Sequence, residues 1–376
     1  MSARLRWVLV LVVIVLGVVA YTARIRYEMV DFITWRQSAV RALQAEPLYR
    51  TEDGHYQFKY LPAFALIMAP LGMLNEEAGK MLWFAVSVAL LAALLRWSVA
   101  GLPDRRLSQS TLAWITLILM AKFYLHELVL GQTNVLLGGL LAGALVAVQR
   151  DRPLTAGALV GAAVFVKPYA LILMPWLLVT KGWRALAMAA GVVAAGLLLP
   201  AVVYGWAGNQ DLLRGWLRTV TDSTTPNLLG NDNVSIAAMW AKWLGPGSPA
   251  TILTLVTLVS TGALVIAVWR WRRGVAAPEY LEFALLMLLI PLVSPQGWDY
   301  LLLLATPALV CLVDRRREFP TLWRWGLSLA LGLMCLSSFD LMGRELYGRF
   351  MALSVVSVCA LIVAVALTHA RWSRLA

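Results

Sequence analysis

Long apolar runs recur from one end of this 376-residue chain to the other, and they limit its fold more than any other feature. Residues 7–23, 78–96 and 250–269 are examples, and each could cross the hydrocarbon of a membrane as a helix. Hydrophobic residues make up 61% of the chain and charged residues only 14%, against about half and about a quarter in soluble domains. The sequence therefore predicts one all-α polytopic membrane domain over residues 1–376, without a separate soluble domain.

The apolar runs predict about 12 transmembrane helices. One stretch, 154–180, fits either a single long helix or two short helices that meet at Lys167-Pro168, and the distribution of charge favours two. The expected helices lie at residues 7–23, 78–96, 110–125, 133–149, 154–167, 168–180, 185–205, 250–269, 279–294, 299–313, 321–339 and 350–369.

The net charge of +12 could indicate a nucleic-acid partner, but the positions of the charges argue against one. The excess lies in short turns between helices, such as Arg105-Arg106, Arg150-Asp151-Arg152 and Arg315-Arg316-Arg317. Cytoplasmic turns of membrane proteins carry such an excess of Lys and Arg. We therefore expect a multi-pass protein of the inner (cytoplasmic) membrane, with both termini cytoplasmic, membrane lipids around it and no nucleic-acid partner.

On this topology, the long and polar loops all face the extracytoplasmic side. They are a first outer loop at 24–77, a second long loop at 206–248, and shorter ones at 125–134 and 294–300. Nucleotide sugars and ATP are absent from that side of the membrane. An activated donor substrate would therefore have to arrive attached to a lipid.

Asp31 begins an amphipathic segment in the first outer loop. Phe32, Trp35 and Ala39 recur there at helical spacing, with Arg36 on the polar side. This pattern predicts a helix that lies in the membrane interface. Asp31 is either only the N-cap of this helix or also a fixed carboxylate that takes part in chemistry. Lys59 and Tyr60 return polar groups to the membrane at the end of the loop.

Gln132 and Asn134 stand between two apolar runs, where an amide is costly unless it is paired. They either cap and bond neighbouring helices or form a hydrogen-bonding wall for a sugar. The nearby His126 is a candidate acceptor-binding residue, and it is not followed by a second His at metalloprotease spacing. With three His in the chain, a His-based metal site is not expected, and the pattern gives no support for a divalent metal.

Lys167 ends an apolar run and is followed at once by a proline. A lysine at the centre of a bilayer costs about 2.5–3.5 kcal/mol on insertion scales. It either reaches back to the interface from the end of its helix or serves as the counter-ion of a lipid phosphate.

Two further outer segments supply candidate acceptor-binding residues. Asn233 lies in the polar part of the 206–248 loop, which we interpret as a lid or acceptor-binding loop. Trp298, Asp299 and Tyr300 lie in a tight turn between two apolar runs. The two aromatic residues are either interface anchors or a platform for a sugar ring.

Several ordered motifs resemble glycosyltransferase family eighty-seven. They are the early Asp31, then FKYLPAFALIMAPLGML, GQTN, VKP, NDNVS and SPQGWDY, and together they cover about residues 25–305. The resemblance implies a GT-C type fold and a polyprenyl-phosphate sugar, usually mannose, as donor. It also implies that Asp31 is the catalytic acid or base and that Gln132, Asn134 and Lys167 line the donor site. Relatives often have a His near Trp298, and this chain has none there.

The chemistry agrees with a single outer carboxylate. A lipid phosphate leaves without a proton, so one general base is enough, with cations to hold the phosphate. We therefore expect Asp31 as the base, with Lys167, Lys59 and Arg36 at the phosphate, and an inverting transfer to a glycan or glycolipid. A transporter or flippase of a lipid-linked sugar is the alternative, and a structural scaffold comes third. The sugar, the acceptor and the oligomeric state are not readable from the sequence.

Overall fold

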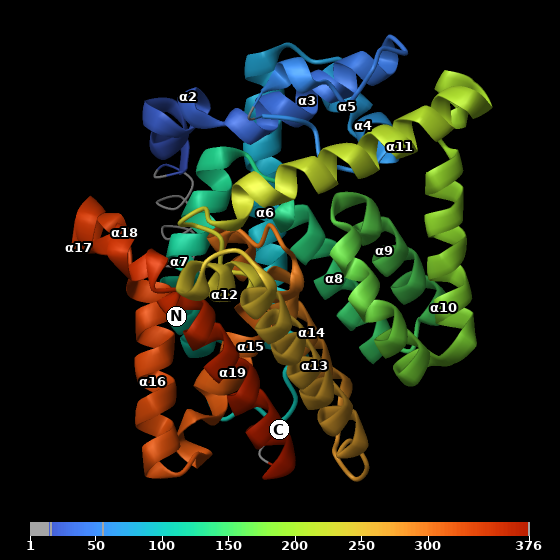
Figure 1. Cartoon of the computed structure of the whole chain (residues 1–376). Helices are drawn as coiled ribbons and strands as arrows, with labels where there is room; N and C mark the ends of the chain where they lie inside the picture. Colours follow the sequence, from blue (N-terminus) through green and yellow to red (C-terminus); the bar gives the residue numbers. More distant parts are fainter. Residues whose placement is uncertain (1–14, 16, 55, 375–376) are drawn as a thin grey trace.

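The structure is a computed structural model that describes residues 15, 17–54 and 56–374 (Figure 1). These residues form helices and no strand. Most of the predicted first helix, 7–23, lies outside them. In chain order the helices are η1 (Tyr21–Ile25), α2 (Arg26–Glu28), α3 (Val30–Leu43), η2 (Thr51–Asp53), α4 (Pro62–Ile67), α5 (Ala69–Gly72), α6 (Glu76–Gly101), α7 (Gln109–Leu130), α8 (Asn134–Gln149), α9 (Pro153–Val166), η3 (Pro168–Leu173), α10 (Met174–Leu198), α11 (Ala201–Leu228), α12 (Ile236–Leu244), α13 (Ser248–Arg270), α14 (Glu279–Val293), η4 (Asp299–Ala305), α15 (Thr306–Arg315), η5 (Arg316–Glu318), α16 (Thr321–Leu336), α17 (Phe339–Met342), α18 (Arg344–Ala352) and α19 (Val355–Trp372).

The centre of the bundle is the hairpin formed by α14, η4 and α15. Every residue from Tyr280 to Leu292 in α14 is buried, and so is every residue of η4. The hairpin packs against α7, α8 and α19. Because α14 is apolar on all sides from Phe283 to Val293, it can lie only where other helices surround it. The turn between α14 and η4 is thereby held at one end of the bundle core.

Five helical stretches in the described part of the chain are long and apolar enough to cross a membrane: α6, α7, Pro168–Leu198, α13 and α19. The third stretch is divided at Gly182 (φ 71°, ψ −167°), between the predicted helices 168–180 and 185–205. Three further apolar helices, α8, α9 and α16, are shorter. These helices agree with the prediction, made from composition, of an all-helical membrane protein. The count of about 12 spans is not confirmed.

The break at Lys167-Pro168 divides 154–180 into two helical parts, as the distribution of charge favoured. α9 ends at Val166, Lys167 is extended (φ −148°, ψ 119°), and η3 begins at Pro168. Proline has no N–H to donate and disfavours helical dihedrals in the residue before it. The lysine side chain is therefore released from the end of an apolar helix.

The segment 206–248 differs from the predicted long loop, because most of it is helical. α11 and α12 occupy it, and α11 runs across one end of the bundle in Figure 1. Leu212, Trp216 and Val220 recur every four residues on α11, which is a helical spacing. The hydroxyls of Thr221 and Thr224 donate to helix carbonyls four residues earlier, so these polar side chains remain compatible with a helix.

The amphipathic segment after Asp31 forms α3, which packs against α4 and α5. Phe32, Trp35 and Ala39 are fully buried. Protein therefore covers the apolar face of α3, where the sequence suggested contact with lipid. That α3 lies at the membrane interface stays a prediction.

Gly131, between α7 and α8, connects α3 to the rest of the bundle. Its carbonyl accepts the indole N–H of Trp35 at 3.2 Å and that of Trp83 at 3.0 Å. Its φ is +67°, and an added Cβ would lie 2.8 Å from the Cβ of Phe32. Only glycine adopts this dihedral without strain and leaves room for α3.

We predict that Gly131→Ala destabilises the protein by about 2 kcal/mol or more, because the left-handed dihedral and the contact with Phe32 both oppose a methyl group. Gly191→Ala on α10 is the matched control, since nothing lies within 4 Å of its added Cβ. We expect this control to be neutral or stabilising by up to about 1 kcal/mol. Thermal unfolding of the detergent-solubilised protein measures both, and equal melting temperatures for the two variants would contradict the prediction.

Candidate active site

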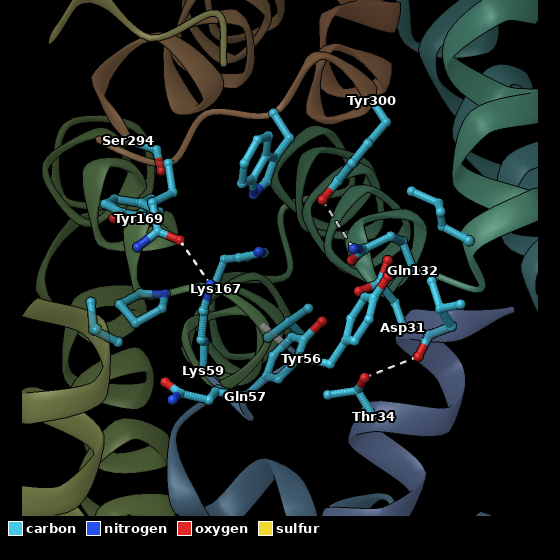
Figure 2. Close-up of a pocket in the computed structure, with 18 of the residues that line it drawn as sticks. Asp31, Thr34, Tyr56, Gln57, Lys59, Gln132, Lys167, Tyr169, Ser294 and Tyr300 are labelled. Atoms are coloured by element: carbon cyan, nitrogen blue, oxygen red, sulfur yellow. Dashed lines mark hydrogen bonds between the residues drawn. The ribbon is translucent and has the colours of Figure 1, made fainter. Parts of the chain in front are cut away.

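A cavity of about 480 Å³ lies where α3, the 56–60 segment, the α7–α8 turn, Lys167 and α11 meet the 294–300 turn (Figure 2). This volume is in the range of small-molecule sites. Eight of the twelve site residues expected from the sequence line the cavity: Asp31, Lys59, Tyr60, His126, Gln132, Lys167, Trp298 and Tyr300.

Asp31 lies in the first turn of α3 and is partly buried. The N-cap position belongs to Met29, and no side chain caps this helix. Asp31 is therefore not the N-cap residue. Burial raises the pKa of Asp31 above its ordinary value, and a hydrogen bond from Gln132 with the charges of Lys167 and Lys59 opposes that rise. The carboxylate thus faces the cavity with both a donor and cations beside it.

Two lysines approach the same cavity from different segments. Lys59 Nζ donates to Gln296 Oε1 at 3.3 Å, and burial lowers the pKa of Lys59. Lys167 Nζ lies 5.6 Å from the centre of the Tyr60 ring, which is cation–π distance. Figure 2 shows the side chains of Asp31, Lys59 and Lys167 converging on this pocket. Two cations beside one carboxylate form a suitable site for a phosphate.

Tyr60 and Tyr300 are held by the turn that follows Gly131. Gln132 Nε2 donates to the Tyr300 hydroxyl at 3.0 Å, and Thr133 Oγ1 donates to the Tyr60 hydroxyl at 3.1 Å. His126 packs edge-on against the Tyr300 ring. The aromatic wall of the cavity is therefore fixed by His126 of α7 and by two polar side chains of the α7–α8 turn.

The remaining four expected residues lie outside the cavity lining, and each has polar contacts with other groups of the protein. Arg36 donates to the Leu74 carbonyl at 2.5 Å, and the fully buried Asn134 donates to Glu127 at 2.9 Å. Asn233 donates to the carbonyl of Pro295 at 2.8 Å. Asp299 is 2% exposed and its Oδ1 lies 3.2 Å from His126 Nδ1. Arg36 and Asn233 therefore have structural contacts in place of the ligand contacts that we expected.

Asn233 joins two segments that are far apart in the sequence. It forms an antiparallel bridge with Trp298, and Val234 N donates to the Gly297 carbonyl at 2.7 Å. Asp299 N donates to the Asp232 carbonyl at 2.8 Å. A Cβ on Gly297 would meet the Pro291 carbonyl oxygen at 1.9 Å, so only glycine fits there. These contacts place Asp232 and Trp298 on the same wall.

Sequence reasoning missed several lining residues. Trp216 Nε1 donates to the Lys59 carbonyl at 3.2 Å, and Gln296 Nε2 donates to the hydroxyls of Ser223 and Thr224 at 3.0 and 3.1 Å. The four-residue spacing on α11 could have indicated Trp216. The only sequence feature that could have indicated Gln296 is its position in a polar turn. The missed polar and aromatic lining residues are Thr34, Tyr56, Gln57, Tyr169, Trp216, Asp232, Ser294 and Gln296.

Asp232 adds a second carboxyl group to the lining. Burial raises its pKa, and the negative charge of Asp299 acts in the same direction, whereas His126 and Lys242 oppose it. In the described part of the chain, no group of three or more His, Cys, Asp or Glu is placed to bind a metal ion.

Cysteine labelling can test whether the cavity is open to water. We predict that Thr34→Cys, which lines the cavity, reacts roughly tenfold faster with a small water-soluble maleimide than Ser38→Cys, one turn further along α3 and 1% exposed. The three native cysteines are buried, so the unmodified protein supplies the background. Mass spectrometry measures the labelling, and equal rates for the two variants would contradict an open cavity at Thr34.

A family model described as glycosyltransferase family 87 matches residues 58–295. A comparison with curated proteins found no match. The matched region includes Lys59, Gln132 and Lys167, whereas Asp31 and Trp298 lie outside it. The position of Asp31 in the site therefore rests on the geometry of the cavity. The match spans more than half of the chain, which belongs to glycosyltransferase family 87 and is a glycosyltransferase.

Proposed function

We propose that this glycosyltransferase moves a hexose from a polyprenyl-phosphate donor to a hydroxyl group of a glycan or glycolipid, on a GT-C type fold. Mannose is the sugar that the resemblance implies. The observation that supports the proposal is the presence of one partly buried carboxylate, Asp31, with two lysines, Lys59 and Lys167, on the same cavity. This set suits a reaction that needs one base and a binding site for a phosphate.

In this reaction, the acceptor oxygen attacks the anomeric carbon as the bond from that carbon to the phosphate oxygen breaks. The acceptor proton passes to the Asp31 carboxylate, and the polyprenyl phosphate leaves with the bonding electrons. Lys59 and Lys167 stabilise the negative charge that grows on the departing phosphate. Since the phosphate needs no proton to leave, a second carboxylic acid is not required, unlike in glycoside hydrolases. A single displacement inverts the anomeric configuration.

We propose that the acceptor occupies the side of the cavity formed by Trp298, Tyr300, His126 and Asp232. Indole and phenol rings offer flat apolar faces to a sugar, and the carboxyl and imidazole groups offer partners to its hydroxyls. The donor phosphate lies at the opposite, cationic side. In this arrangement, a hydroxyl of the bound acceptor lies between the acceptor-binding residues and Asp31.

The positive-inside distribution of Lys and Arg supports an extracytoplasmic cavity in the inner membrane, with both termini cytoplasmic. The cavity lies at the end of the bundle crossed by α11, and the basic turn Arg315-Arg316-Arg317 follows α15 at the other end of the central hairpin (Figure 1). This orientation explains why a lipid-linked donor, and not a nucleotide sugar, is the proposed substrate.

The base assignment is tested with purified protein, polyprenyl-phosphate mannose and a panel of glycolipid acceptors. We expect Asp31→Asn to lower kcat by about 10²- to 10⁴-fold, because the amide cannot accept the proton. Asp211→Asn, an exposed acid on α11 paired with Arg214, is the matched control and should retain activity. Full activity in Asp31→Asn would rule out Asp31 as the base. Movement of donor lipid between vesicle leaflets without any transfer would favour a flippase.

We predict that the activity falls on the acid side at a pH above the ordinary pKa of an aspartate. The base acts in its ionised form, and burial raises the pKa of Asp31, so protonation removes activity earlier as the pH falls. Lys59→Met should shift this acid limb to still higher pH, because the charge of Lys59 favours ionised Asp31. The pH dependence of kcat/KM measures the shift, with Arg344→Met on α18 as the control. A shift to lower pH in Lys59→Met would contradict the assignment.

A further inference from the structure

We infer that Asn134 and Glu127 are positioning residues that hold the amide of Gln132 with its N–H groups toward Asp31. This inference rests on the proposed function, in which Asp31 is the base. The sequence suggested that Asn134 contacts the donor, but it is fully buried and lies outside the cavity lining. Glu127, 1% exposed, stands behind it.

Three side chains form a directed series of hydrogen bonds. Asn134 Nδ2 donates to Glu127 Oε2 at 2.9 Å and to Gln132 Oε1 at 3.5 Å. Gln132 Nε2 donates to the Tyr300 hydroxyl at 3.0 Å. Gln132 and Asp31 line the same cavity, and a hydrogen bond from Gln132 is one cause that opposes the raised pKa of Asp31. The nitrogen of each amide thus donates, and the oxygen of Gln132 accepts from Asn134.

When Glu127 is ionised, the chemistry of the groups fixes the direction of this series. An ionised carboxylate only accepts hydrogen bonds, whereas an amide has one donating and one accepting end. The other oxygen of Glu127 accepts from Val135 N at 2.7 Å, so both carboxylate oxygens are occupied by donors. If the Asn134 amide were reversed, its oxygen would face the Glu127 carboxylate. The N–H end of Asn134 therefore points to Glu127 and to Gln132 Oε1, and the N–H end of Gln132 is left for Asp31 and Tyr300.

This orientation matters because Asp31 has few donors of its own. The charged and titratable groups that interact with it are Lys59, Lys167, His126, Glu127, Tyr60 and Tyr300. Among these contacts, the Gln132 hydrogen bond is the largest effect that opposes the cost of burying the carboxylate. If Gln132 turned over, its carbonyl oxygen would face the Asp31 carboxylate, and the ionised base would lose that donor.

The test compares pH profiles of kcat/KM for Gln132→Leu, Asn134→Leu and the double variant. A hydrogen bond to an ion contributes about 1.5–3 kcal/mol, so the loss of the donor should move the acid limb up by about one pH unit. Asn134→Leu should move it in the same direction and lower kcat, with donor KM changed less than about twofold. The double variant should match Gln132→Leu alone, because Asn134 acts only through Gln132.

Two controls separate positioning from a general loss of structure. Thr116→Val removes a buried hydroxyl from α7 that has no hydrogen-bond partner, and it should leave the acid limb in place. Asn134→Ala covers the case in which leucine does not fit. An unmoved limb in both folded Asn134 variants, or additive effects in the double variant, would overturn the inference. An active Asp31→Asn enzyme would instead overturn the base assignment, which is a distinguishable result.

Discussion

The carbonyl of Gly131 is the contact on which the geometry of the site depends. It accepts two indole N–H groups, from Trp35 on α3 and Trp83 on α6. A buried carbonyl without partners would cost about 1–3 kcal/mol, so both donors stabilise one arrangement of three helices. Trp35 lies one helical turn after Asp31, and Gln132 is the next residue after Gly131. The same interaction that packs α3 therefore also sets Asp31 beside Gln132.

The other walls of the cavity come from segments that are distant in the sequence, and each is fixed by hydrogen bonds of its own. Lys59 is held through its carbonyl by Trp216 and through its ammonium by Gln296. Lys167 is released into the cavity because Pro168 stops α9 directly after an apolar run. Cations on a loop and at a helix break can lie beside a partly buried carboxylate without entering the apolar core, which suits the proposed binding of a phosphate.

A residue of this site could be predicted from the sequence where its immediate sequence neighbours marked it as unusual. It could not be predicted where its contacts depend on tertiary packing. Lys167 was identifiable because a lysine followed directly by a proline is unusual at the end of an apolar run. Asp31 followed from the placement of its loop and from a family resemblance. The contacts of Asn134 and Asn233 could not be predicted, since an amide next to apolar sequence satisfies either a ligand or a neighbouring side chain or carbonyl, and only the tertiary packing decides which. α11 was taken for a loop because its polar residues outweighed the spacing of Leu212 and Trp216.

The bridge between Asn233 and Trp298 joins two segments that are distant in the sequence into one part of the molecule. The chain from α11 to α12 is short, and its backbone is bonded to the 294–300 turn on both sides of Trp298. An inserted or deleted residue between Leu229 and Ser235 would shift the register of that bridge and turn Trp298 away from the cavity. The length of this connection therefore determines the shape of this cavity wall as much as the identity of the residues that line it.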